Sequence, residues 1–239
     1  MTDTSAEVRY DMHAIPTMYS GIRFRSRLEA KWAAFFDICG WRWEYEPFDL
    51  NGWMPDFLLL GDQRVLVEVK PVTWMPWSVT KKIEKAMGNP ADSHYELMIL
   101  GCTVPIGEHE NQIGWLAEKE DLYDWEPEMG GYDTQWQWGG AILGRWSNQE
   151  IVGFCHDTGW FTDRISGAYD GGVWGNGWIE DNTPEKIFRC AANLVQWNSP
   201  EKNPTPPYRL FFPNNTKRIL DRPADAAEPT GLVDGTDKL

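Results

Sequence analysis

Three residues in the first third of the chain have the types and the spacing that phosphodiester hydrolysis requires. Asp56 follows a proline, Glu68 stands twelve residues later, and Lys70 follows Glu68 after a single valine. Two neighbouring carboxylates repel each other, and a divalent cation with oxygen ligands relieves that repulsion. A lysine beside such a cation can orient a water for in-line attack on a phosphodiester. The three residues therefore predict a metal-dependent hydrolytic site.

The segments around these residues are predicted to be adjacent strands. Residues 56–60 and 64–70 are apolar on both faces, which is typical of central strands that are covered on both sides, and residues 61–63 (Gly-Asp-Gln) have the chemistry of a turn. A three-residue loop there puts Asp56 directly opposite Glu68, with their Cβ atoms about 5 Å apart. The lysine two residues after Glu68 points to the same face.

An ordinary surface hairpin with two carboxylates and an edge lysine would contain the same residues. A Glu-x-Lys triplet arises about once by chance in a chain of this length and average composition. The catalytic interpretation depends on context, because charges are costly on strands that are otherwise apolar.

The first hundred residues are predicted to be an α/β unit with the order α-β-β-β-α-β. A helix begins near Ser26 and stops at Gly40, and a second helix is capped by Ser78 and ends before Pro90. The predicted strands are residues 41–46, 56–60, 64–70 and 95–100.

The Pro55-Asp56 pair, followed by Glu68-Val69-Lys70 in this order of elements, resembles the PD-(D/E)xK nuclease superfamily, which is restriction-endonuclease-like and includes many phage proteins. The resemblance covers roughly residues 20–101. It implies that Asp56 and Glu68 bind Mg²⁺, with Mn²⁺ as a substitute, that the Val69 carbonyl completes the shell, and that Lys70 positions the attacking water.

Many members of that superfamily also place a glutamate on the first helix near the metal, and Glu29 matches that position. Ser26 and Glu29 also have the spacing of a capping box, which is a purely structural alternative. Arg25 and Arg27 are candidates for phosphate contact, or they are solvated residues at a helix start.

The second helix carries a basic face. Lys81, Lys82 and Lys85 are candidates for contact with a nucleic-acid backbone, with an ordinary solvated face as the alternative. Trp74 and Trp77 precede that face and could stack on unpaired bases, although packing in the core is favoured for both.

The chain is acidic, and its charge is unevenly distributed. Lys and Arg number 22 against 36 Asp and Glu, a net charge of −14, and the excess lies after residue 100. A large phosphate-binding surface is therefore not expected in the second half. That half is a candidate surface for a protein partner or a second copy of the chain.

Four regions are expected. They are an N-terminal arm (1–20), the nuclease core (21–101), a Trp-rich accessory region of short strands and loops that ends in a helix (102–198), and a Pro-rich, partly disordered tail (199–239). Thr183 and Pro184 signal the start of that last helix.

The four cysteines form no Cys-x-x-Cys pair, so reduced, buried thiols are expected, with zinc at Cys155, His156 and Cys190 as a minor alternative. The histidines show no catalytic spacing. No apolar stretch is long enough to cross a membrane, and no secretory signal is evident. A cytoplasmic location is expected.

The predicted function is a metal-dependent DNA endonuclease of the kind that phages or mobile elements carry as an accessory nuclease. One alternative is a catalytically idle nuclease-fold module that binds nucleic acid or a protein partner. Another is a carbohydrate groove lined by the tryptophans of the acidic half, although its carboxylates are too numerous to choose a catalytic pair.

Overall fold

A computed structural model describes residues 14–122, 133–145, 152–158, 162–169 and 182–196. The predicted tail at 199–239 and most of the predicted arm lie outside these residues. Within them, no helix is both long and apolar enough to cross a membrane.

The protein is mixed α/β, as predicted, and its centre is one sheet of seven strands in the order β3-β4-β5-β6-β7-β8-β9. Only β5 and β6 run parallel, while the other neighbouring strands are antiparallel. The strands are β3 (Trp43–Tyr45), β4 (Phe57–Leu60), β5 (Arg64–Val69), β6 (Glu96–Leu100), β7 (Gln112–Leu122), β8 (Asp133–Arg145) and β9 (Val152–His156).

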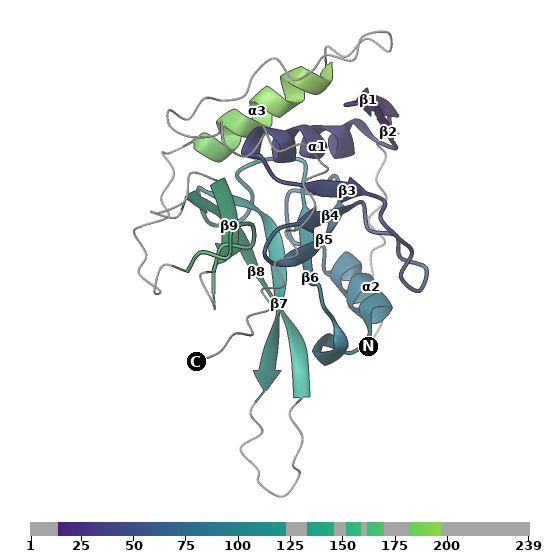
Figure 1. The fold of residues 1–239 in the computed structure, drawn as a ribbon, viewed down its shortest axis with the longest axis vertical. Helices are drawn as coiled ribbons and strands as arrows, with labels where there is room; N and C mark the ends of the chain where they lie inside the picture. Colours follow the sequence, from purple (N-terminus) through teal and green to yellow (C-terminus); the bar gives the residue numbers. More distant parts are fainter. Residues whose placement is uncertain (1–13, 123–132, 146–151, 159–161, 170–181, 197–239) are drawn as a thin grey trace, which may run out of the picture.

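Helices cover both faces of this sheet (Figure 1). The first face packs against α1 (Arg27–Cys39), α3 (Thr183–Gln196) and a small hairpin of β1 (Thr17–Tyr19) and β2 (Ile22–Phe24). The second face packs against α2 (Trp77–Met87), which is followed by the short 3-10 helix η1 (Pro90–Asp92). Residues of β4 and β5 alternate between the two apolar clusters, which explains why both strands carry apolar side chains on both faces.

Helix α1 begins and ends where the sequence predicts. The Ser26 hydroxyl accepts a hydrogen bond from the Glu29 amide at 3.1 Å, and Gly40 ends the helix with a φ of 75°. Glycine adopts that left-handed conformation without steric cost. Trp32 is fully buried between the sheet and α3, where it contacts Phe188.

The predicted cap of the second helix is wrong. Helix α2 begins one residue earlier than Ser78, its N-cap is Pro76, and no side chain caps it. The Pro76 carbonyl accepts hydrogen bonds from the amides of Val79 and Thr80, and no serine hydroxyl caps the first turn.

The expectation of short strands after residue 102 is also wrong. Strands β7 and β8 contain 11 and 13 residues, and their hairpin projects well beyond the rest of the sheet (Figure 1). Gly139 lies so close to the side chains of His156 and Asp157 that a Cβ there would clash. Such glycines interrupt the alternation of apolar and polar residues by which a strand is recognised in a sequence. The predicted boundary between residues 101 and 102 falls between β6 and β7 of the same sheet.

A buried ion-pair cluster anchors residues 162–169 on the sheet. The Arg164 guanidinium donates to Glu96 Oε2 at 2.8 Å and to Glu118 Oε2 at 2.7 Å. Glu96, the first residue of β6, pairs with Val65, the second residue of β5, so the cluster lies at the end of β5 that is remote from Glu68.

Candidate functional site

Three carboxylates lie side by side in a row at one end of three neighbouring strands: Glu46 follows β3, Asp56 precedes β4 and Glu68 is near the end of β5. The hairpin of β4 and β5 has the predicted register, with Leu60 opposite Arg64 and Phe57 opposite Val67, which continues to Asp56 opposite Glu68. On the other side of β4 the amide of Glu46 donates to the carbonyl of Asp56 at 3.0 Å. Neighbouring strands are about 4.8 Å apart, so these side chains start close together.

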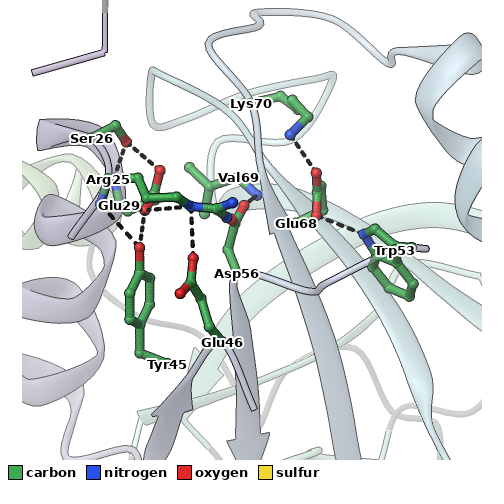
Figure 2. A network of polar contacts seen from close by, with 10 residues as sticks. All are labelled: Arg25, Ser26, Glu29, Tyr45, Glu46, Trp53, Asp56, Glu68, Val69 and Lys70. Atoms are coloured by element: carbon green, nitrogen blue, oxygen red, sulfur yellow. Dashed lines mark hydrogen bonds and ion pairs between the residues drawn. The ribbon is translucent and has the colours of Figure 1, made fainter. Parts of the chain in front are cut away.

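Asp56 is almost completely buried and accepts two hydrogen bonds (Figure 2). The amide of Val69 donates to Oδ2 at 2.7 Å, and the guanidinium of Arg25 donates to Oδ1 at 2.5 Å. Burial, together with the nearby Glu68 carboxylate, raises the pKa of Asp56 to about 7. The surroundings therefore disfavour the ionised form of Asp56, and an additional cation at the site would stabilise that form.

Glu68 is also buried, and both of its carboxylate oxygens have partners. The indole N–H of Trp53 donates to Oε2 at 2.8 Å, and the Lys70 ammonium donates to Oε1. Burial opposes the charge of Lys70, but the Glu68 and Asp56 carboxylates outweigh it and raise the pKa of Lys70. Lys70 therefore stays protonated and acts here as a hydrogen-bond donor.

Glu29 approaches the row from the N-terminal turn of α1. Its carboxylate accepts from the Tyr45 hydroxyl at 2.6 Å, the Ser26 hydroxyl at 2.7 Å and the Arg25 amide at 3.2 Å. The reciprocal bond of a capping box is therefore made to residue 25 rather than to Ser26. Glu29 therefore caps the helix and also lies within the network around Asp56 (Figure 2). The structure agrees with both predictions for Glu29, the capping box and the place near the predicted metal site.

Arg25 faces the carboxylates. Its guanidinium lies 2.7 Å from Glu46 Oε1, 2.5 Å from Asp56 and 4.0 Å from Glu29. The carboxylates raise its pKa further despite partial burial. Arg25 thus holds the row together, and a phosphate would have to compete with two ion pairs for it. Arg27, the other predicted phosphate contact, is exposed.

The charges of the network do not balance. Glu29, Glu46, Asp56 and Glu68 face Arg25 and Lys70, so the carboxylates exceed the cations by two. Carboxylate oxygens are the ligands that Mg²⁺ and Mn²⁺ prefer. The donor set therefore has the chemistry and the charge that suit one divalent cation.

The backbone of β5 adds an oxygen on the same side. The N–H and the carbonyl of one residue in an extended strand point in the same direction. Because the Val69 amide donates to Asp56, the Val69 carbonyl also faces β4. In the described part of the chain, no group of three or more His, Cys, Asp or Glu residues could hold a metal ion. Mg²⁺ does not need such a group, because it usually keeps several waters and takes one or two carboxylates.

The remaining predicted site residues lie on or just before α2. Lys81, Lys82 and Lys85 are all exposed. The expectation that Trp74 and Trp77 pack in the core is wrong, since both indoles are mostly solvent-exposed. The minor zinc hypothesis finds no support, because Cys155, His156 and Cys190 form no metal-binding group among the described residues.

Tyr45, Glu46 and Trp53 were missed from the sequence. The signal for Glu46 was present, because the antiparallel register that pairs Tyr45 with Phe57 also pairs Glu46 with Asp56. No pattern in the sequence predicted the contact of Trp53 with Glu68. Trp53 follows an Asn-Gly turn, and only the tertiary structure brings the two residues together.

Comparison with protein-family models, with curated proteins and with solved structures found no match to this chain.

Proposed function

We propose that this chain is a metal-dependent DNA endonuclease in which Asp56, Glu68 and the Val69 carbonyl bind Mg²⁺ or Mn²⁺. The observation that carries the proposal is the pairing of two buried carboxyl groups across the β4–β5 hairpin, inside a network in which carboxyl groups outnumber cations by two. A core like that of the restriction-endonuclease fold is part of this proposal. Its support is the order α1-β3-β4-β5-α2-β6.

In this proposal each residue has a defined task. Asp56 and Glu68 supply carboxylate oxygens, and Val69 holds Asp56 in place through its amide. Lys70, two residues beyond Glu68, orients a water towards the scissile phosphate. The divalent cation, when bound, polarises the phosphoryl oxygen and stabilises the charge that develops on it. Trp53 holds Glu68 in place through the hydrogen bond from its indole N–H to Oε2.

Arg25 and Glu29 support these residues from α1. Arg25 neutralises part of the charge of Asp56 and Glu46, and Glu29 orients Tyr45 and the start of the helix. A direct role of Glu29 at the metal would require its carboxylate to give up at least one of its three donors.

Plasmid nicking tests the proposal. Purified protein is incubated with supercoiled plasmid and Mg²⁺, then Mn²⁺, and compared with Glu68→Gln and Lys70→Met. We expect nicked plasmid from the wild type and losses of at least about a hundredfold in both variants, as for residues that act in the chemical step. Glu44→Gln is the matched control, because Glu44 is an exposed carboxylate on β3. Equal activity of all four proteins would contradict the proposed site.

A second candidate function is an idle nuclease-fold module that binds nucleic acid or a protein partner. It is favoured by one observation, namely that Arg25, Lys70, Trp53 and Val69 already provide a donor for every oxygen of Asp56 and Glu68. Calorimetric titration with Mg²⁺ separates the two functions. Heat of binding that disappears in Glu68→Gln supports the enzyme, whereas absence of binding to the wild type supports the idle module.

A further inference from the structure

Two tryptophans on the α2 side of the candidate site are exposed without an evident structural reason. Trp74 and Trp77 keep 62% and 63% of their surface in contact with solvent, more than any other large hydrophobic residue in the described part of the chain. A tryptophan that packs in a core removes a great deal of apolar area from water. These two do not, so their indole faces are available to a ligand.

The segment that carries the tryptophans is fixed beside the site. Trp74 follows Lys70 by four residues, so their Cα atoms lie at most about 14 Å apart. The base of the segment is held by Val72, whose amide donates to the Lys70 carbonyl at 2.7 Å and whose carbonyl accepts from Cys102 at 3.0 Å. Val72 itself is buried. The indoles therefore project from an anchored segment.

The exposed charge on α2 is entirely basic. Lys81 and Lys85 share with Trp77 the side of the helix opposite the buried Ile83, because residues four apart lie on one face. Lys82, three residues before Lys85, is exposed beside that face. The helix has one acid, Glu84, and its carboxylate accepts from the indole of Trp138 at 2.6 Å. These three lysines form a local basic surface on a chain whose net charge is −14, and such a surface attracts an anionic ligand.

We propose that Trp74 and Trp77 stack on unpaired bases while Lys81, Lys82 and Lys85 bind the phosphates of the same strand. The preferred substrate class is then a nucleic acid with a single-stranded segment, such as a flap, fork or gap, rather than an intact duplex, which is bound more weakly. Aromatic side chains beside a positive surface are the usual means of binding single strands, because every base has a π face, whereas duplex bases are already stacked. This inference rests on the proposed nuclease function for its site, but binding can be measured without cleavage.

Fluorescence anisotropy in EDTA tests the inference. The probe is a fluorescein-labelled single-stranded DNA oligonucleotide, with a blunt duplex of the same sequence for comparison. We expect the wild type to prefer the single strand, and the variant Trp74→Ala/Trp77→Ala to bind it at least about tenfold more weakly. The variant Trp74→Phe/Trp77→Phe keeps two aromatic faces and should recover most of the affinity. Tyr169→Ala removes an exposed aromatic residue elsewhere and should change nothing.

Salt dependence separates the two contributions. The variant Lys81→Gln/Lys82→Gln/Lys85→Gln should reduce the slope of log affinity against log salt by about two, because each phosphate contact on a single strand contributes about 0.7. The tryptophan variant should weaken binding and leave that slope unchanged.

The outcomes distinguish this inference from the proposed function. Single-strand binding that depends on the tryptophans upholds the inference even if the wild type cleaves no DNA, in which case only the nuclease proposal fails. If the alanine variant binds the single strand as well as the wild type, the inference is overturned, and cleavage of plasmid would still uphold the nuclease. A wild type that prefers the duplex, or binds neither DNA, overturns it as well, and the indoles then serve another partner such as a protein.

Discussion

Binding of Mg²⁺ at the Asp56/Glu68 pair should release a proton at acid pH. Burial and the Glu68 carboxylate raise the pKa of Asp56 to about 7. Asp56 is then about nine-tenths protonated at pH 6 and about one-tenth protonated at pH 8. A carboxylate must be deprotonated before it can bind a metal ion. Mg²⁺ therefore competes with the proton on Asp56 below pH 7.

The size of the effect follows from the same pKa. The apparent affinity for Mg²⁺ should be about tenfold lower at pH 6 than at pH 8, which corresponds to about 1.4 kcal/mol. Close to one proton should leave the protein per Mg²⁺ bound at pH 6, and almost none at pH 8. An ordinary exposed aspartate, with a pKa near 3.9, would give neither effect in this range.

Isothermal titration calorimetry measures both quantities. Titrations at pH 6 in two buffers with different enthalpies of ionisation give the number of protons released, and titrations at pH 8 give the reference affinity. Asp56→Asn should abolish binding at both pH values. Asp92→Asn, which changes an exposed aspartate on η1, is the matched control. Equal affinity at pH 6 and pH 8, with heats independent of buffer, would refute the reasoning that Asp56 is a buried, protonated ligand.

Three further predictions concern stability. In EDTA, the free energy of unfolding of the metal-free protein should fall as the pH rises from about 4 to about 7, because the native state binds the proton of Asp56 more tightly than the unfolded chain does. Asp56 should account for up to about 4 kcal/mol of this fall. In urea unfolding, the Asp56→Asn variant should lack that part of the dependence of stability on pH. Arg164→Met should cost about 3–5 kcal/mol in the free energy of unfolding, because it leaves the Glu96 and Glu118 carboxylates unpaired, and Glu96→Gln/Glu118→Gln in the same chain should restore part of the loss. Ser26→Ala should lower stability by about 1 kcal/mol through the lost cap of α1, and an unchanged urea midpoint would contradict that role.

The central hairpin and the ends of α1 were determined by the sequence alone, because both depend on neighbours in the chain. A loop of fixed length sets the register of two strands, and a slip by one residue would move every apolar side chain to the wrong face. The pairing of Asp56 with Glu68 therefore follows from the length of the loop and the apolar pattern on either side of it. The cap at Ser26 and the glycine at residue 40 are equally local signals.

The rest of the candidate site was decided by tertiary structure. Arg25 meets Asp56 across 31 positions of the sequence, and Trp53 meets Glu68 from a loop that carries no periodic pattern. Contacts of that kind depend on how α1 and the loop before β4 dock on the sheet, and a local pattern does not encode docking. The same reason explains Trp74 and Trp77, because composition favours burial of tryptophan, and only the packing of α2 on the second face leaves both indoles in solvent.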